Sequence, residues 1–194
     1  MEITVDVIAD TSGSMEEMGK RHISKGLLRY VNQLRQLTPT ATDNIQYRFF
    51  TWSDTLDRFY FDESGVLSVS TTNGNSNLEA LSSHVNNANS NYCWIVLSDG
   101  CFSSTQINTF ISNVDSDLRD RLFTVAIGAD AEIYKLTKLS SKGQCFLPEN
   151  IATAVSLALH SFNKSSSPIP EYNSDVSLSS DIGSDIGSKD DWDA

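Results

Sequence analysis

Cysteine and basic residues are scarce in this sequence of 194 residues, and long apolar runs are missing altogether. The three cysteines, Cys93, Cys101 and Cys145, are widely spaced and form no CxxC pair. This usage is typical of free thiols in a reducing compartment and not of a disulfide framework. We therefore expect free and mostly buried cysteines.

The shortage of basic residues gives the chain a strongly acidic balance. Fourteen Lys and Arg residues stand against 25 Asp and Glu residues, for a formal net charge of −11 at pH 7. This charge repels nucleic-acid phosphates and anionic lipid headgroups, so we expect neither nucleic acid nor a membrane surface as a partner. The sequence begins without a basic region or a long apolar stretch, which predicts no signal peptide, no transmembrane segment and a cytoplasmic location.

Apolar residues form short continuous runs that alternate with stretches of helical periodicity. The strand-like runs are 3–9, 44–52, 55–61, 92–98, 122–128 and 143–148, and the helix-like stretches are 23–37, 78–88, 107–114, 131–139 and 151–162. The second and third runs are joined by a short turn, as in a hairpin. The pattern predicts an α/β fold, in which a doubly wound, mostly parallel sheet has one antiparallel hairpin strand and helices on both faces.

The composition changes after residue 163. Residues 164–194 are rich in Ser, Asp and Gly, contain the repeat "SDIGSDIG" and hold seven of the 25 acidic residues. Such a segment has too few apolar residues to offset the entropy lost on ordering. We expect one folded domain over 1–163 and a disordered acidic tail over 164–194, which is either a solubilising tail or a docking or phosphorylation segment.

Three oxygen-rich loops occupy comparable places at or near the ends of predicted strands. The first holds Asp10, Ser12 and Ser14, the second holds Ser76 just before a helix, and the third holds Asp99. Ligands of doubly wound sheets bind at the carboxyl ends of the strands, where such loops meet. Carboxylates and hydroxyls without nearby histidine or cysteine suit Mg²⁺ or Mn²⁺ better than zinc. The sequence therefore predicts an oxygen-only metal site.

Each of these residues also has a simpler explanation. Serine and aspartate commonly cap helices, and Ser14 or Asp99 taken alone is more often a cap than a ligand. We favour the metal because independent caps would seldom place oxygen groups in all three loops. Other residues that carry chemistry in some proteins are expected to be surface or packing residues here: His22, His84, His160, Trp52 and Trp94.

The motifs "DTSGSM", "GNSNL" and "LSDG" resemble the metal-ion-dependent adhesion site of von Willebrand factor A domains. The resemblance extends over about residues 1–163. It implies that Ser12 and Ser14 bind the metal directly, and that Asp10 and Asp99 mostly hold coordinating waters and balance charge. The family's third hydroxyl is usually a threonine, and Ser76 stands at the matching position.

The spacing after Ser76 departs from the family pattern by one position, so Thr72 and Asn77 are alternative third ligands. The resemblance also implies a non-catalytic module that binds a protein partner, whose Asp or Glu carboxylate completes the metal's coordination. The chain resembles small cytoplasmic bacterial proteins of the tellurite-resistance type, which are associated with kinase and phosphatase partners in signalling or stress response. An alternative is a subunit of a larger machine built around an AAA+ ATPase or a proteasome.

A magnesium-dependent phosphatase of the haloacid-dehalogenase type is the least favoured function. That chemistry also uses an aspartate at a strand end, but it requires a second acid two residues later, and position 12 is serine. We find no convincing lysine and acidic pair for it and no Ser-His-Asp order or phosphate-binding glycine loop. We therefore predict that the protein is not an enzyme.

Overall fold

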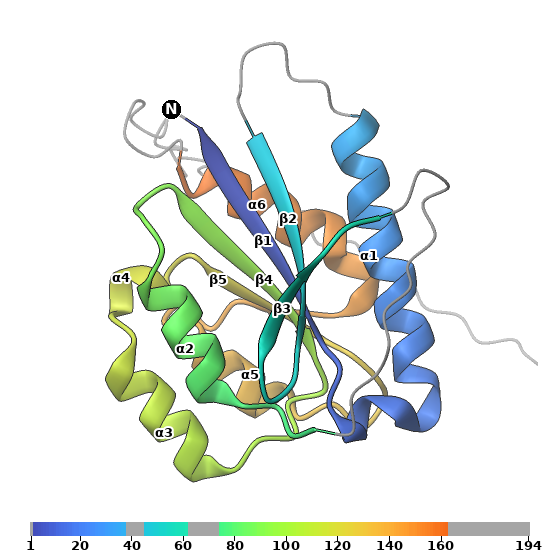
Figure 1. Ribbon diagram of the computed structural model, residues 1–194, viewed down its shortest axis with the longest axis vertical. Helices are drawn as coiled ribbons and strands as arrows, with labels where there is room; N and C mark the ends of the chain where they lie inside the picture. The colour runs from blue at the N-terminus through green and yellow to red at the C-terminus, as the bar shows by residue number, and fades with distance from the viewer. Residues whose placement is uncertain (1, 38–44, 62–73, 163–194) are drawn as a thin grey trace, which may run out of the picture.

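A six-stranded sheet forms the centre of the fold (Figure 1). The computed structural model describes residues 2–37, 45–61 and 74–162. The strands are β1 (Ile3–Asp10), β2 (Ile45–Trp52), β3 (Leu56–Phe59), β4 (Tyr92–Ser98), β5 (Leu122–Ala126) and β6 (Cys145–Phe146). They lie in the order β3-β2-β1-β4-β5-β6, and every neighbouring pair is parallel except the antiparallel β2–β3 hairpin.

Helices cover both faces of this sheet (Figure 1). On one face lie α1 (Lys20–Leu37) and α6 (Ile151–His160), and on the other lie α2 (Leu78–Asn86), α3 (Ser104–Asn113) and α5 (Ile133–Leu139). Shorter elements are the 3₁₀ helices η1 (Gly13–Gly19) and η2 (Pro148–Asn150) and the single turn α4 (Ser116–Arg119). The predicted α/β fold class is confirmed.

The central strand β1 shows why the sheet is buried on both sides. Val5, Val7 and Ala9 pack into the core beneath α1 and α6, whereas Ile8 packs into the core beneath α2, α3 and α5. Successive side chains of a strand point to opposite faces, so a strand between two helical layers needs apolar residues at nearly every position. This requirement explains the nearly continuous apolar run, which Thr4 and Asp6 interrupt.

One charged residue is buried in β1 and is fully paired. Asp6 has no exposed surface, and its carboxylate accepts hydrogen bonds from Arg48 Nε at 2.7 Å and Arg48 Nη2 at 2.6 Å. His84 Nε2 lies 2.8 Å from Asp6 Oδ2. The parallel register of β1 and β2 places Asp6 opposite Arg48, so strand pairing itself compensates the buried charge. His84, which was expected to be a surface or packing residue, thus contacts a buried carboxylate.

The remaining predictions on single side chains can be compared with the structure. Trp52 and Trp94 are completely buried core residues, as expected. The three cysteines are free, but only Cys93 is buried, and the prediction of burial is wrong for Cys101, which is exposed in the loop after β4. In the described part of the chain, no helix combines the length and the hydropathy needed to cross a bilayer. The predicted tail lies outside the described residues.

The strand order creates a switch point in the centre of the sheet. From β1 the chain moves to β2 and β3 on one side, and later crosses to β4, β5 and β6 on the other. Loops that leave β1 and β4 therefore diverge, and the carboxyl ends of two such strands are where ligands bind in open α/β sheets. Asp10 is the last residue of β1, and Asp99 directly follows β4.

Candidate metal centre

Asp10 lies at the centre of a buried hydrogen-bond network at this switch point. Its Oδ2 accepts hydrogen bonds from Ser98 Oγ at 2.6 Å and Ser76 Oγ at 2.9 Å, and its Oδ1 accepts one from the Ser12 amide at 2.9 Å. Asp10 is 2% exposed and Ser98 is fully buried. The network joins the carboxyl ends of β1 and β4 to the loop that precedes α2.

Three hydroxyl groups converge beside this carboxylate. Ser76 Oγ lies 2.9 Å from Ser12 Oγ, which lies 3.2 Å from Ser14 Oγ. Ser12 and Ser76 are buried, whereas Ser14 is partly exposed and marks the side that is open to solvent. The structure therefore brings together Asp10, Ser12, Ser14 and Ser76, as the sequence analysis predicted.

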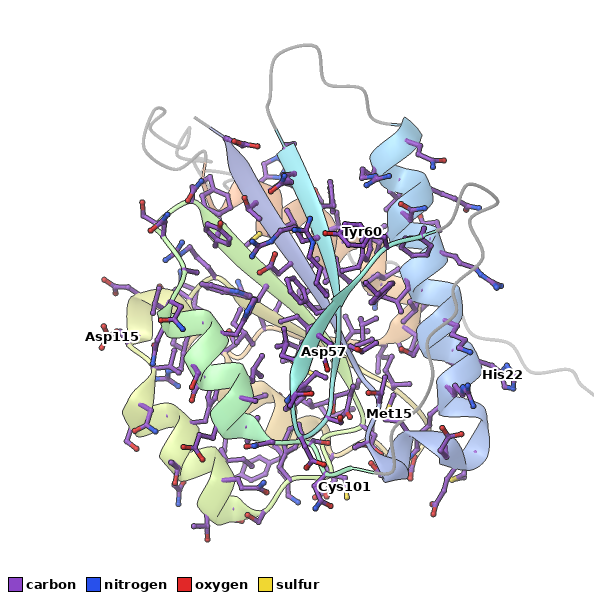
Figure 2. The ribbon with its side chains drawn as sticks, in the orientation of Figure 1. Met15, His22, Asp57, Tyr60, Cys101 and Asp115 are labelled. Carbon is purple, nitrogen blue, oxygen red and sulfur yellow. The ribbon has the colours of Figure 1, made fainter. Side chains whose placement is uncertain are left out.

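Backbone hydrogen bonds hold the loops in register. The Thr11 amide and hydroxyl both donate to the carbonyl of Trp52, at 2.7 and 3.1 Å, and the Gly13 amide donates to the Gly74 carbonyl at 3.0 Å. The first loop is thus tied to the end of β2 and to the segment before α2. Figure 2 shows Met15 and Cys101, which follow the first and third loops, at the same end of the molecule.

Asn77, one of the alternative third ligands, has a different role. It is the N-cap of α2, where its Oδ1 accepts a hydrogen bond from the Glu79 amide at 3.0 Å. Its carbonyl accepts one from Trp52 Nε1 at 2.9 Å. Asn77 therefore fixes the start of the helix, while the preceding Ser76 hydroxyl points into the hydroxyl cluster. Thr72 lies outside the described residues.

Helix capping does not account for the serines. Ser12 occupies the N-cap position of η1, yet its side chain makes no capping hydrogen bond there. Its hydroxyl is instead in contact with those of Ser14 and Ser76. Asp99 does use Oδ1 to accept the Cys101 amide at 3.1 Å, which is a local turn of the kind aspartate favours.

The sequence analysis missed a lysine at the edge of this cluster. Lys20 Nζ lies 2.8 Å from Asp99 Oδ2 and 2.7 Å from Asp130 Oδ2, and it donates to the Ser14 carbonyl at 3.2 Å. Lys20 is 1% exposed. Asp130 follows β5, whose carboxyl end adjoins that of β4, and the strand-end rule could have found it. No periodicity in the sequence marks Lys20 as inward-facing.

Burial and charge shift the pKa values of these groups in different ways. Burial raises the pKa of the Asp10 carboxyl, and hydrogen bonds from Ser98, Ser12 and Ser76 offset this only in part. Burial lowers the pKa of Lys20, but its hydrogen bonds to Asp130 and Asp99 outweigh this and leave the pKa raised. A hydrogen bond from Lys20 holds the pKa of Asp130 below its usual value. Lys20 therefore stays charged at neutral pH.

The donor set fits a hard divalent cation. Three hydroxyl oxygens lie within 3.2 Å of their neighbours beside a buried carboxylate, so the side chains described in this cluster offer oxygen atoms to a cation. Among the described residues, no group of three or more His, Cys, Asp or Glu side chains is placed to hold a metal ion. Ligation here would depend on serine hydroxyls, which leave most of a cation's charge uncompensated.

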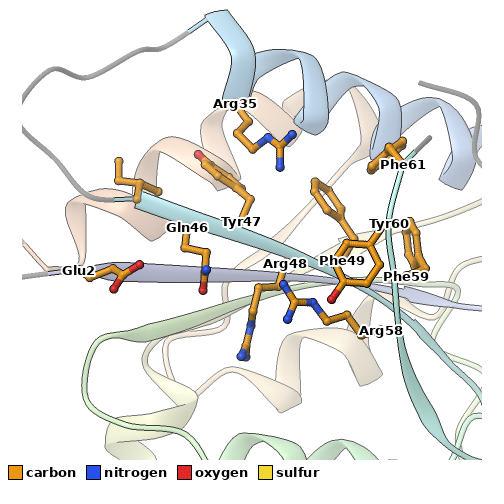
Figure 3. A pocket seen from close by; sticks show the side chains of 11 residues that line it. Glu2, Arg35, Gln46, Tyr47, Arg48, Phe49, Arg58, Phe59, Tyr60 and Phe61 are labelled. Carbon is orange, nitrogen blue, oxygen red and sulfur yellow. The ribbon is translucent and has the colours of Figure 1, made fainter. Parts of the chain in front are cut away.

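A cavity of about 520 Å³ lies away from this cluster, along β2 and β3 beside α1 (Figure 3). Aromatic residues and three arginines line it, among them Tyr47, Phe49 and Arg58. Two of these arginines have partners, since Arg48 is bound to Asp6 and the guanidinium of Arg58 lies 4.9 Å from the ring centre of Tyr60.

Structural comparison identifies the fold. VWA2, an ArnB paralog from Sulfolobus acidocaldarius, matches 79% of the chain at 20% identity with a TM-score of 0.55. A von Willebrand factor type A structure from Catenulispora acidiphila matches 81% at 16% identity with a TM-score of 0.52. The fold is that of a von Willebrand factor A (VWA) domain.

A third similar structure carries a metal. Proximal thread matrix protein 1 from the mussel byssus, with a zinc-occupied adhesion-site motif, matches 82% of the chain at 13% identity with a TM-score of 0.54. The chain spans 44% of the length of the Sulfolobus protein, 41% of the Catenulispora protein and 47% of the mussel protein. At these identities the likeness shows the VWA fold alone. No family model and no curated protein matches the sequence.

Proposed function

We propose that this VWA domain is a non-catalytic module that binds a protein partner through one Mg²⁺ or Mn²⁺ ion. Ser12, Ser14 and Ser76 would supply the direct ligands, and Asp10 and Asp99 would balance charge and orient coordinating waters. The observation that carries the proposal is the convergence of three hydroxyls, two from the loop after β1 and one from the loop before α2, beside the buried Asp10 carboxylate. An all-oxygen set of this kind favours Mg²⁺ or Mn²⁺.

The chemistry of the site favours an acidic partner. A cation bound mainly by neutral hydroxyls supplies uncompensated positive charge on its solvent side. Ser14 is partly exposed on that side, so an incoming Asp or Glu carboxylate can approach there. Such a carboxylate gains both coordination and charge compensation, whereas a neutral amide gains little. One acidic residue within a matching surface would then select the partner.

The wider role is proposed from resemblance. A cytoplasmic adaptor in signalling or stress response, with kinase or phosphatase partners, fits a domain of this size. A subunit of an AAA+ ATPase or proteasome-like machine is the alternative. The zinc in the mussel protein's motif supports divalent-metal binding at this type of site. The burial of Asp10 and its three hydrogen bonds argue against the free nucleophile that a phosphatase needs.

Affinity capture with the full chain as bait tests the proposal. We expect a partner to be retained in millimolar Mg²⁺ and released by EDTA, and to be lost from the Ser12→Ala and Asp99→Ala baits. Ser82→Ala is a matched control, because Ser82 is also a buried serine but bonds only within α2, to the Glu79 carbonyl. Exchange of one interfacial Asp or Glu of the partner for Asn or Gln should abolish binding as well. A partner that stays bound through chelation and both site variants would show that another face is used.

A further inference from the structure

Lys20 is a buried ammonium whose three hydrogen-bond donors are all used. It begins α1, and it bonds Asp99, Asp130 and the carbonyl of Ser14, which come from three different segments of the chain. An ammonium group has three donors and no acceptor, so this environment satisfies it completely. Lys20 is 1% exposed, and a buried charge is costly unless it is paired and hydrogen-bonded. The surrounding residues therefore accommodate this ammonium group specifically.

The backbone just before Lys20 and the backbone at Gly128 both have conformations that accommodate its side chain. Met18 has a φ of 52° and Gly19 a φ of 75°, so two successive left-handed residues turn the chain into α1. A side chain at Gly128 would approach Lys20 Cγ and Cε to 2.9 Å, and the φ of Gly128 is 97°. The left-handed Met18 is costly for a residue with a side chain, and such strain persists where the surroundings require it.

The ammonium shares its partners with the proposed metal site. It holds Asp99 Oδ2, while Asp99 Oδ1 accepts the Cys101 amide, so both oxygens of this carboxylate have partners within the protein. It also holds the carbonyl of Ser14, whose hydroxyl belongs to the cluster. A fixed positive charge therefore lies beside the position where a cation would bind, well within a Debye length.

We infer that Lys20 is a built-in counter-cation that sets the divalent-metal affinity of the site. It neutralises Asp99 and Asp130 when no metal is bound, which stabilises the fold, and its charge opposes a bound cation. This inference rests on the proposed metal-dependent function. It predicts that affinity follows the local charge, so that removing the ammonium tightens metal binding and removing the Asp130 carboxylate weakens it.

Titration of the full chain with Mn²⁺, followed by the electron paramagnetic resonance of free Mn²⁺, measures this directly. We expect Lys20→Met to bind Mn²⁺ about tenfold more tightly, because one unit charge next to a divalent ion is worth at least this much even in a water-like dielectric. Asp130→Asn should bind about threefold more weakly, since the side chain of Asp130 is 43% exposed and its charge is screened. Lys142→Met makes the same charge change at a distant, half-exposed ion pair with Asp120, and should bind like the wild type.

Melting curves in EDTA provide a second measurement that involves no metal. Lys20→Met should melt roughly 10 °C below the wild type, because Asp99 is left buried and uncompensated, and Mn²⁺ should restore much of the loss. Lys142→Met should show no such loss. If Lys20→Met melts like the wild type in EDTA, the counter-cation role is overturned. If Lys20→Met fails to fold, the Asp130→Asn affinity decides, and an affinity equal to or tighter than that of the wild type overturns the inference.

The outcomes also separate this inference from the proposed function. If the wild type binds Mn²⁺ and Lys20→Met binds it equally or more weakly, the role of Lys20 is overturned. The proposed metal site is unaffected by that result. A change of Mn²⁺ affinity in the same direction for Lys20→Met and Asp130→Asn would also overturn the role of Lys20. A charge effect predicts opposite changes in the two variants, whereas a merely structural role does not. Absence of Mn²⁺ binding in every variant would overturn the proposed function and the inference together.

Discussion

At the scale of single residues, the buried carboxylate of Asp10 is the group of the site whose ionisation costs folding free energy. It is 2% exposed, and burial raises the pKa of its carboxyl despite hydrogen bonds from three serines. A carboxyl group whose pKa is raised on folding stabilises the fold at low pH, and this contribution is lost as the pH rises through the folded-state pKa. At neutral pH the ionised carboxylate therefore costs stability unless a cation lies beside it.

Asp10→Asn should consequently stabilise the protein in EDTA. The amide keeps the shape of the side chain and removes the buried charge, so we expect the melting temperature at pH 7.5 to rise by a few degrees. The same variant should lose the rise of roughly 5 to 10 °C that saturating Mg²⁺ gives the wild type. Melting curves of both proteins, with and without EDTA, measure the two effects. An Asp10→Asn protein that is less stable than the wild type in EDTA would show that the charge of Asp10 does not destabilise the fold.

At the scale of elements, the site depends on how three segments end or begin. β1 ends at Asp10, β4 ends at Ser98, and α2 begins directly after Asn77. The Asn77 cap and its carbonyl bond with Trp52 fix the position of the Ser76 hydroxyl. The start of a helix thus positions a hydroxyl of the candidate metal site, while the Asn77 side chain caps the helix.

Asn77→Ala tests this dependence of the site on a helix cap. Loss of an Asn cap typically costs about 1 kcal/mol, so we expect a fall in melting temperature of roughly 2 to 4 °C. Mn²⁺ affinity should also fall, because Ser76 is held less firmly. Asn77→Asp keeps a good cap and serves as the control for both measurements. Unchanged Mn²⁺ affinity in Asn77→Ala, together with the loss of stability, would mean that Ser76 is positioned by other contacts.

Elements with a strong apolar pattern are predictable from the sequence, and those without one are not. The mostly apolar run 3–9 predicts β1, which ends one residue later, because a strand buried on both faces is rich in apolar residues. The last strand is predicted over 143–148 but is only Cys145–Phe146, since only these residues pair with β5. The 3₁₀ helix Gly13–Gly19 has no sequence signal, because its shape depends on the left-handed Met18 and not on periodicity.

The site likewise contains residues that can be located from the sequence and contacts that cannot. A strand-end argument can locate these residues at one edge of the sheet, where Ser76 bonds Asp10 and contacts Ser12: Asp10, Ser12, Ser14, Ser76 and Asp99. The pairing of Lys20 with Asp130 joins residues 110 positions apart. Such a contact follows from tertiary packing, and short-range patterns in the sequence do not reveal it.

At the scale of the whole molecule, the described residues form two cores, one on each face of the sheet. The core beneath α1 and α6 includes Ile151, Ala154 and Ala158 of the last helix. β6 is parallel to β5, so its carboxyl end lies at the edge of the sheet that carries the metal centre. The described part of the chain thus contains every residue of the proposed site.

Truncation after residue 163 should therefore leave the domain intact. We expect its melting temperature to change by no more than about a degree, and its Mn²⁺ affinity to match that of the full chain, because residues 164–194 have too few apolar residues to add to a core. Melting curves and Mn²⁺ titrations of the two chains make the comparison. A large loss of stability would show that the acidic tail folds against the domain.

The central claim is that the hydroxyl cluster beside Asp10 binds one divalent cation. Anomalous diffraction from crystals grown in millimolar Mn²⁺ tests it most directly, because the anomalous signal locates the ion itself. The account predicts a single strong peak bounded by the hydroxyls of Ser12, Ser14 and Ser76, and the loss of this peak in Ser12→Ala crystals. A map with no peak at the cluster, or with a peak that persists unchanged in Ser12→Ala, would contradict it.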